Sequence, residues 1–380
     1  SGTNPYYYPL VSGILLYYSQ GDAISNLTIL GNYMGIGLFC SGGITLRDIN
    51  MISNVYNFGV EGYSLSDYIH DVDNSNTVDG KPVVYFVNEH NKEVPSDAGY
   101  VALVNSTNII VEDLNLTKNF ESVLFAYASD CTIRNVFASA SYVGAYLTHS
   151  SVALVQNNVI VNNSEGIYLN HARDNKVSNN TVMNNQDGIN LYCSDANMIS
   201  FNNLLNNDLG LFLEKSNDNA ISSNEISENK YGIYLRRSTH DALRNNNMTI
   251  NTYNFGVIGT HLLHYIHDVD NSNIIDGKPL YYLIDRHDLV IDSATVPDIG
   301  YLGIINSKNI TLRNLNLTKN IQGVLLAYCN DSLLTDLNIS SNIWGVLMVS
   351  SFTNIITRGV IAKNEYGVEM RYCYSNTIQA

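Results

Sequence analysis

The tetrapeptide Gly166-Ile167-Tyr168-Leu169 recurs as Gly188-Ile189-Asn190-Leu191, Gly210-Leu211-Phe212-Leu213 and Gly232-Ile233-Tyr234-Leu235, each copy 22 residues after the last. A fixed period of this length is typical of solenoids, in which each repeat forms one coil and buries its apolar side chains only against its neighbours. Apolar residues alternate with residues expected to point outward, with a period of two. This alternation indicates short β-strands and argues against helices.

Other positions of the repeat are equally regular when each glycine is numbered zero. Positions 1, 3, 11 and 16 are apolar, as in Ile167, Leu169, Val177 and Val182. Positions 9, 14 and 19 are asparagine, as in Asn175, Asn180 and Asn185. We expect the apolar residues to point inward, and each asparagine amide to donate to one neighbouring coil and accept from the other. Asparagine also tolerates the left-handed backbone of a sharp corner. The sequence therefore predicts an all-β, right-handed parallel β-helix.

Two segments of the chain are copies of each other. Residues 68–76 recur at 265–273, and Asp79-Gly-Lys-Pro82 recurs at 276–279. We interpret the chain as a single β-helix domain, 1–380, made of two related halves at approximately 1–250 and 251–380. Insertions at 61–99 and 258–300 interrupt the 22-residue period. An Asp-Gly pair between β-forming residues indicates a tight hairpin, so each insertion is predicted to project from the side of the rod as a hairpin.

These duplicated elements, followed by Asn-rich coils, resemble the NosD-like right-handed β-helix proteins of archaeal cell surfaces. That family is grouped with carbohydrate-binding and sugar-hydrolysis β-helix domains. The resemblance covers nearly the whole chain and implies the fold. For function it implies less, because the family takes its name from a copper-enzyme maturation factor while most of its surface members look structural or adhesive.

Composition excludes several classes of function. Only 14% of residues are charged and the net charge is −15, with no basic run, so duplex nucleic acid is not an expected partner. No apolar stretch is long enough to cross a bilayer. Cys329 and Cys373 share a repeat position but lie two coils apart, roughly 10 Å, too far for a disulfide. We therefore predict that the five cysteines are free thiols.

Ten Asn-x-Ser/Thr sequons are glycosylation candidates and suit an extracellular or cell-surface protein. They are Asn26, Asn105, Asn115, Asn162, Asn179, Asn247, Asn309, Asn316, Asn330 and Asn338. None of them occupies one of the three asparagine positions assigned to the interior.

An aromatic ladder is predicted at position 2 of the repeat, which points outward. Its members are Tyr146, Tyr168, Phe212 and Tyr234. Stacked rings of this kind bind sugar faces or another subunit; the alternative is that they only stabilise the sheet surface.

Two groups of residues are candidate metal ligands. Oxygen ligands at calcium-loop-like spacing recur in both copies, at Asp71, Asp73, Asp79, Asp268, Asp270 and Asp276, and suggest either a structural Ca²⁺ or polar turns held by their own hydrogen bonds. His261, His264 and His267 invite a copper or zinc interpretation, although strand alternation would put His264 on the opposite face. No other cofactor is predicted.

No catalytic residues are predicted, because no carboxylates align over adjacent coils as polysaccharide-cleaving β-helices require. No capping segment is recognised at either end of the chain, which suggests either a fragment of a longer chain or a head-to-tail junction. We predict the junction, between Tyr6, Tyr7 and Tyr8 of one copy and Asn376 and Ile378 of the next. The leading hypothesis is a non-catalytic, extracellular structural protein of an archaeal-type surface that polymerises into a filament or sheath. The alternative is a carbohydrate-binding or polysaccharide-cleaving β-helix, with surface glycans as partners. A third hypothesis is a metal-handling accessory protein.

Overall fold

The computed structural model describes residues 12–296 and 298–379, and the chain divides into two compact units, residues 1–186 and 187–380. The fold is the predicted all-β parallel solenoid of about 17 turns, with coils spaced by about 22 residues. None of the helices in the described ranges has the length and apolar character needed to cross a membrane.

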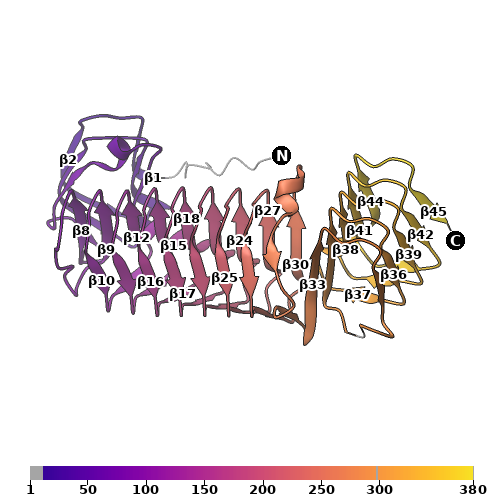
Figure 1. The fold of residues 1–380 in the computed structure, drawn as a ribbon. Helices are drawn as coiled ribbons and strands as arrows, with labels where there is room; N and C mark the ends of the chain where they lie inside the picture. Colours follow the sequence, from indigo (N-terminus) through magenta and orange to yellow (C-terminus); the bar gives the residue numbers. More distant parts are fainter. Residues whose placement is uncertain (1–11, 297, 380) are drawn as a thin grey trace. The chain divides into compact units, whose positions relative to one another are not determined.

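Unit 1 contains two stacks of coils. The first stack comprises β1 (Ser12–Tyr17), β2 (Ala23–Leu30), β3 (Met34–Phe39), β4 (Thr45–Ile52), β5 (Tyr56–Glu61), the short helix η1 (Leu65–Tyr68), β6 (Asp71–Val72) and β7 (Thr77–Val78). The second comprises β8 (Lys81–Val87), β9 (Tyr100–Val104), β10 (Ile110–Glu112), β11 (Asn115–Thr117), β12 (Glu121–Ala126), β13 (Thr132–Arg134), β14 (Phe137–Ser139), β15 (Val143–Thr148), β16 (Leu154–Gln156), β17 (Val159–Val161), β18 (Glu165–Asn170), β19 (Lys176–Ser178) and β20 (Thr181–Met183). Strands β8, β9, β12, β15 and β18 stand side by side in one parallel sheet (Figure 1).

Unit 2 repeats this plan. Its first stack comprises β21 (Asp187–Tyr192), β22 (Met198–Ser200), β23 (Asn203–Leu205), β24 (Leu209–Glu214), β25 (Ala220–Ser222), β26 (Glu225–Ser227), β27 (Tyr231–Arg236), β28 (Ala242–Arg244), β29 (Asn247–Thr249), β30 (Tyr253–Ile258), η2 (Leu262–Tyr265), β31 (Asp268–Val269) and β32 (Ile274–Ile275). Its second comprises β33 (Lys278–Ile284), β34 (Val290–Asp292), β35 (Tyr301–Ile305), β36 (Thr311–Arg313), β37 (Asn316–Thr318), β38 (Gln322–Ala327), β39 (Leu333–Thr335), β40 (Asn338–Ser340), β41 (Trp344–Val349), β42 (Ile355–Thr357), β43 (Val360–Ala362), β44 (Tyr366–Arg371) and β45 (Thr377–Gln379).

The coils follow the register read from the sequence. Val155 lies opposite Val177 and Tyr146 opposite Tyr168, each pair 22 residues apart. The apolar positions point inward as predicted, and Ile167, Leu169 and Val177 are fully buried. The five cysteines are free, and Cys40, Cys131 and Cys329 are buried.

The asparagine ladders are confirmed, but they do not form the corners. The Asn158 backbone N–H and side-chain amide both donate to Asn180 Oδ1, at 3.0 and 2.9 Å, and Asn180 donates to the Val155 carbonyl. At the asparagine corners the left-handed residue is the one before the ladder asparagine, such as Asn179 (φ 56°). At the remaining corner it precedes the small residue, as His149 (φ 50°) and His171 (φ 51°) do. The ladder asparagines are therefore selected for their amide hydrogen bonds and not for a positive φ.

A two-residue hairpin joins the two stacks of each unit. Strand β7 pairs antiparallel with β8 across Asp79-Gly80, and β32 pairs antiparallel with β33 across Asp276-Gly277. Both residues of each turn have positive φ, the geometry that favours Asp-Gly. The hairpins are confirmed, but the prediction that they project from the rod was wrong, because each one is the link between two stacks. The boundaries of the predicted halves stay a prediction.

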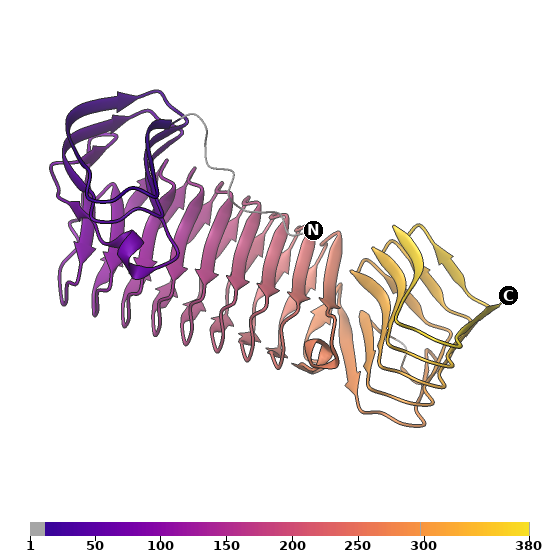
Figure 2. The same ribbon diagram turned by 90° about the horizontal axis from the view of Figure 1, so that it is seen from above.

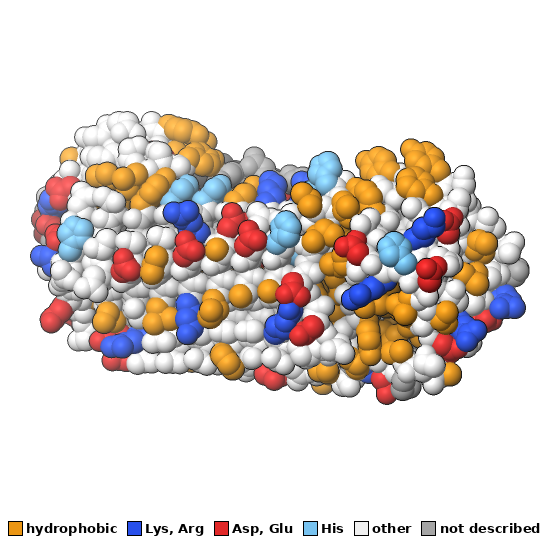
Figure 3. Space-filling view, viewed as in Figure 1, with side chains coloured by type: hydrophobic (Ala, Val, Ile, Leu, Met, Phe, Trp, Pro, Cys, Tyr) orange, Lys and Arg blue, Asp and Glu red, His pale blue; other side chains and the backbone are white. Residues whose placement is uncertain are grey.

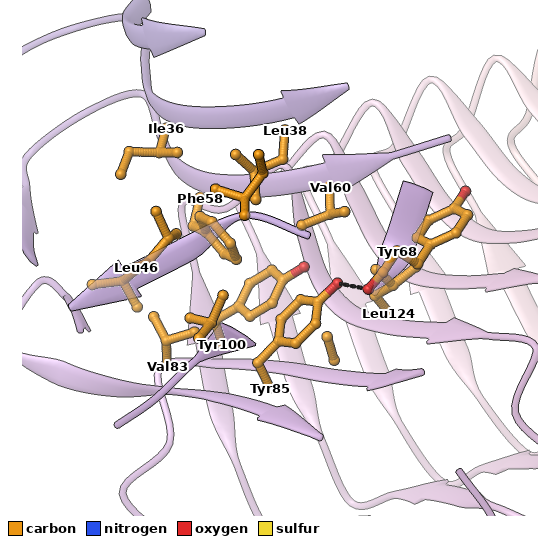
Figure 4. Close-up of a cluster of buried hydrophobic side chains, with 14 of the residues drawn as sticks. Ile36, Leu38, Leu46, Phe58, Val60, Tyr68, Val83, Tyr85, Tyr100 and Leu124 are labelled. Atoms are coloured by element: carbon orange, nitrogen blue, oxygen red, sulfur yellow. Dashed lines mark hydrogen bonds between the residues drawn. The ribbon is translucent and has the colours of Figure 1, made fainter. Parts of the chain in front are cut away.

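The hairpin changes which face of the sheet is inside. The strand direction reverses at the hairpin, but new coils are still added at the same edge of the sheet. If the solenoid keeps the same handedness, the second stack must therefore enclose the face of the sheet that was outside in the first stack. In unit 1 the core of the first stack therefore continues over the outer face of β9, β12 and β15. Phe58 and Val60 share one buried cluster with Tyr85 and Leu124 (Figure 4), and Tyr146 belongs to the same cluster. Figure 2 shows the first stack, in indigo, as a separate body beside the strands of the second.

We call the packed region around β5, η1, β8, β9, β12 and β15 joint 1, and the corresponding region of unit 2, around β30, η2, β33, β35, β38 and β41, joint 2. Closely approaching backbones define both joints. A Cβ on Gly59 of β5 would lie 2.2 Å from the Phe120 Cβ, and one on Gly256 of β30 would lie 2.3 Å from the Ile321 Cβ. Glycine at these positions lets the last strand of one stack pass over the next.

Candidate functional site

The two joints share one apolar and tyrosine framework. In joint 1 the Tyr85 hydroxyl donates to the Tyr68 carbonyl at 2.6 Å, and Phe58 packs edge-on against Tyr100 with ring centroids 4.9 Å apart (Figure 4). In joint 2, Tyr282 donates to the Tyr265 carbonyl at 2.7 Å, and the corresponding ring pair is 4.8 Å apart. This framework is what the duplication preserves, so it accounts for the structure of a joint.

Several positions depart from that common framework, and four of them form the contrast around Glu61. Where joint 1 has Glu61, Tyr146, Thr148 and Asn170, the aligned positions of unit 2 are Ile258, Leu347, Val349 and Arg371. Leu347 and Val349 are buried, and Ile258 is half-buried. A joint can therefore be closed with aliphatic side chains at three of these positions. Joint 1 instead places polar and titratable groups there, which costs desolvation and marks a candidate functional site.

We name Glu61, Tyr68, Tyr146, Thr148 and Asn170 the Glu61 cluster. The Asn170 side-chain amide donates to the Tyr146 hydroxyl at 3.0 Å. The hydroxyls of Tyr68 and Tyr146 both interact with the Thr148 side chain and lie in the field of the Glu61 carboxylate. Tyr68, Tyr146 and Thr148 are buried, whereas Glu61 and Asn170 are half-buried and reach solvent.

Burial raises the pKa of the Glu61 carboxyl to about 7. Burial also raises the pKa of Tyr68 and of Tyr146, with the nearby Glu61 charge contributing to both shifts. Near neutral pH the cluster therefore holds neutral tyrosines beside a carboxyl that exchanges a proton. Such a group can either donate or accept a hydrogen bond.

A row of stacked rings borders the cluster. Tyr127 and His149 stack in parallel at 4.6 Å, and His149 and His171 at 5.0 Å. Nδ1 of His149 is bonded to Thr148 Oγ1 at 3.0 Å, and Nδ1 of His171 to Asn170 Oδ1 at 2.7 Å. Burial, and then the charge of His171, lower the pKa of His149, so its ring is neutral at neutral pH.

The aromatic ladder predicted from the sequence is only partly at the surface. Tyr146 is 3% exposed, because the first stack of unit 1 covers it, so the expectation of an exposed ring was wrong there. Tyr168 is half-buried and stacks in parallel on Tyr146 at 5.2 Å. In unit 2, Phe212 and Tyr234 are half-buried, and the Arg236 guanidinium lies over the Phe212 ring. The mutually stacked faces of Tyr146 and Tyr168 are not free for a sugar ring.

The predicted calcium loops are held by arginine. Arg47 is ion-paired with Asp71 and Asp73 at 2.5 and 3.1 Å, and Arg244 is paired in the same way with Asp268 and Asp270. Asp79 accepts hydrogen bonds from the Ser53 backbone and the Asn57 side chain. Asp276 accepts the equivalent pair from Ile250 and Asn254. These carboxylates fasten the hairpins to the preceding coils, and a guanidinium stands where a cation would bind.

The three histidines of unit 2 are not arranged as a metal site. Nδ1 of His267 accepts the Asp241 N–H at 3.3 Å and its Nε2 donates to the His264 carbonyl at 3.2 Å, so both ring nitrogens are committed to the protein. His264 Nδ1 accepts the Thr260 N–H at 3.1 Å. Within the described ranges, no group of three or more His, Cys, Asp or Glu side chains is arranged to hold a metal ion.

The remaining predicted residues lie apart from the Glu61 cluster. Of the ten sequon asparagines, Asn247 and Asn330 are half-buried and the others are exposed. Tyr6, Tyr7 and Tyr8 fall outside the described residues. Ile378 is 54% exposed, and Asn376 continues a ladder by accepting the Asn354 amide at 3.0 Å. The head-to-tail junction stays a prediction.

Glu61 was missed by the sequence reasoning. The signal that could have found it is the duplication itself: Tyr56-Asn57-Phe58-Gly59-Val60 is identical to Tyr253-Asn254-Phe255-Gly256-Val257, and the next position changes from glutamate to isoleucine. Positions 63, 64, 66 and 67 also differ between the copies, so this exchange stands out only once the structure shows that Glu61 packs into joint 1.

The fold and its repeated asparagine ladders define a parallel β-helix protein. The family described as "Periplasmic copper-binding protein (NosD)" matches residues 73–280, and the chain belongs to this family. None of the curated proteins matches the sequence significantly. No set of side chains in the described ranges fits the copper named in the family description. His149 and His171 form only a pair, and Nδ1 of each ring is already engaged.

Solved structures of similar fold include the A-module of mannuronan C-5 epimerase AlgE4 from Azotobacter vinelandii, with 14% identity and a TM-score of 0.38 over 96% of this chain and 91% of that one. The periplasmic alginate epimerase AlgG has 14% identity and a TM-score of 0.37, covering 94% and 78%. DFA-IIIase from Arthrobacter chlorophenolicus has 9% identity and a TM-score of 0.37, covering 84% and 82%. At these identities the similarity concerns the fold alone.

Proposed function

We propose that this protein is an exported carbohydrate-binding β-helix protein that binds a neutral glycan at the Glu61 cluster. The observation that carries the proposal is the contrast between the joints: Glu61, Tyr146 and Thr148 replace the aliphatic Ile258, Leu347 and Val349. Polar groups in a joint that closes without them are retained for a ligand. The periplasmic description of the family supports an exported location.

The chemistry of the cluster favours sugar hydroxyls. Glu61, Asn170 and His171 reach solvent and supply carboxyl, amide and imidazole groups, which pair with hydroxyls acting as donor and acceptor at once. Tyr68, Tyr146 and Thr148 lie behind them and fix their positions. Glu61 carries the only charge of the cluster, so a neutral glycan suits it better than an anionic one. Over the face visible in Figure 3, charged side chains of both signs are interspersed, without a large basic patch to attract a polyanion.

Binding is favoured over cleavage. Glycoside hydrolysis generally uses two carboxyl groups that both reach the substrate. Two further carboxyls lie at this joint. Glu121 is fully buried, and Asp67 is engaged by the Tyr63 and Ser64 N–H groups, both at 3.0 Å. We therefore propose recognition without hydrolysis. The head-to-tail filament stays a prediction of the sequence.

The test is a calorimetric binding screen against neutral and anionic oligosaccharides with two matched variants. Asn170→Ala removes a hydrogen-bonding group from the cluster and is expected to weaken binding by about 5–10-fold, the value of one hydrogen bond. Arg371→Ala changes the aligned position of unit 2 and should leave affinity unchanged. Equal loss in both variants, or no binding of any neutral glycan, would contradict the proposal.

A further inference from the structure

A second buried carboxyl of joint 1 has an uncharged counterpart in joint 2. Glu121 Oε2 accepts the Val60 N–H and the Tyr100 hydroxyl, both at 3.2 Å. At the aligned position, Gln322 Oε1 accepts the Val257 N–H at 3.3 Å and the Tyr301 hydroxyl at 3.0 Å. Both side chains are fully buried, and each bridges the last strand of one stack to the first strands of the next.

The two side chains differ in their remaining atom. Gln322 Nε2 donates to the Val257 carbonyl at 3.2 Å, which completes a two-way bond with that residue. The corresponding atom of Glu121, Oε1, is fully buried and has no hydrogen-bond partner. A carboxylate cannot donate there. A protonated carboxyl can, and it would then reproduce the bonding of Gln322.

The surroundings favour the protonated form. The titratable groups that face Glu121 are Glu61 of β5, Tyr85 of β8, Tyr100 of β9 and Tyr146 of β15. None of these is a cation. Burial raises the pKa of Glu121 well above its usual value, and the neighbouring Glu61 charge adds to the shift.

We propose that a proton held by Glu121 locks the two stacks of unit 1 together. Loss of this proton opens joint 1 and thereby weakens glycan binding at the Glu61 cluster. The effect on glycan binding rests on the proposed function; the lock itself does not. Joint 2 carries a permanent lock, because Gln322 cannot titrate. Glutamate in place of glutamine adds pH sensitivity to an otherwise equivalent contact.

The sign of the pH effect follows from proton linkage. Glu121 binds its proton more tightly in the closed joint than in the open one, so closure is favoured at low pH. As pH rises above the pKa of an exposed glutamate, the opening constant is expected to rise by up to about tenfold per pH unit. The Val60 amide, which donates directly to Glu121, should lose protection from hydrogen exchange over this range.

The experiment is hydrogen–deuterium exchange from about pH 5 to about pH 8 on the intact chain, corrected for the intrinsic rate. It is run in a Glu61→Gln background because Glu61 also titrates in joint 1. Protection of the peptide containing Val60 is expected to fall with pH relative to the peptide containing Val257. Glu121→Gln should abolish that fall, and Gln322→Glu should create one at Val257.

Each outcome bears on one claim. If Val60 and Val257 show the same pH dependence, or if Glu121→Gln leaves the fall intact, the lock is refuted. Glu121→Gln is expected to fold, because joint 2 closes around a glutamine; it carries the test even if Gln322→Glu fails to fold. In an otherwise wild-type chain at about pH 8, Glu121→Gln should bind glycan more tightly than wild type. If hydrogen exchange behaves as expected but no glycan binds, the proposed function is overturned, whereas the Glu121 lock is still supported.

Discussion

Replacing Glu61 with glutamine should stabilise unit 1 in a pH-dependent way. The Glu61 pKa is raised from 4.5 to about 7 by burial, and each pKa unit corresponds to about 1.4 kcal/mol. The ionised form is therefore disfavoured by about 3 kcal/mol, which we reduce to about 2 kcal/mol because the side chain is half-buried and partly solvated. Since the folded pKa is raised, this stability is fully present below about pH 4.5 and is lost as pH rises to about 7.

Glutamine resembles the protonated carboxyl and does not titrate, so the variant keeps the stability that the wild type loses as pH rises. For a unit of this size, about 2 kcal/mol corresponds to roughly 4–8 °C in the unfolding midpoint. Scanning calorimetry should show the variant and wild type melting together near pH 4.5 and separating by roughly that amount near pH 8. The matched control is Ile258→Gln in joint 2, whose effect should not vary with pH. A Glu61→Gln difference that is constant across pH would show that ionisation of Glu61 does not destabilise unit 1.

Three further predictions concern the fold and its ions. Asn180→Ala should cost about 2–4 kcal/mol in denaturant unfolding, because Asn158 loses the acceptor of two buried donors; a cost below about 1 kcal/mol would show that the ladder contributes little. Gly59→Ala should destabilise unit 1 by about 3 kcal/mol, because the new methyl group meets Phe120; unchanged stability would mean that the stacks separate freely. Calcium or a chelator should leave the unfolding midpoint unchanged, because Arg47 already pairs with the hairpin carboxylates; a rise with calcium would restore the metal site.

The period of the sequence was enough to predict the coils. Inward positions such as Ile167 and Val177 and ladder positions such as Asn180 follow from spacing alone, because each coil contacts mainly its neighbours. The Asp79-Gly80 hairpin was equally predictable from its local chemistry.

What the hairpin does to the chain was not predictable from local pattern. Whether the next coils continue outward or fold over the preceding stack depends on contacts between distant residues, such as Gly59 against Phe120. This packing buried Tyr146, whose position in the repeat indicated an outward ring, and it brought Glu61 beside Tyr146 across a long separation in sequence. The candidate site is a product of that packing, and in the sequence the exchanges between the copies, such as Glu61 for Ile258, are its trace.

Joint 1 is proposed to be a ligand site, and joint 2 is not. Hydrogen exchange with and without a saturating neutral oligosaccharide identified in the binding screen tests this proposal most directly, because both joints are measured in one chain. We expect ligand-dependent protection confined to peptides from 56–70 and 143–172, with none at 253–267 and 344–373. Protection at both joints alike, or only outside them, would contradict the proposal.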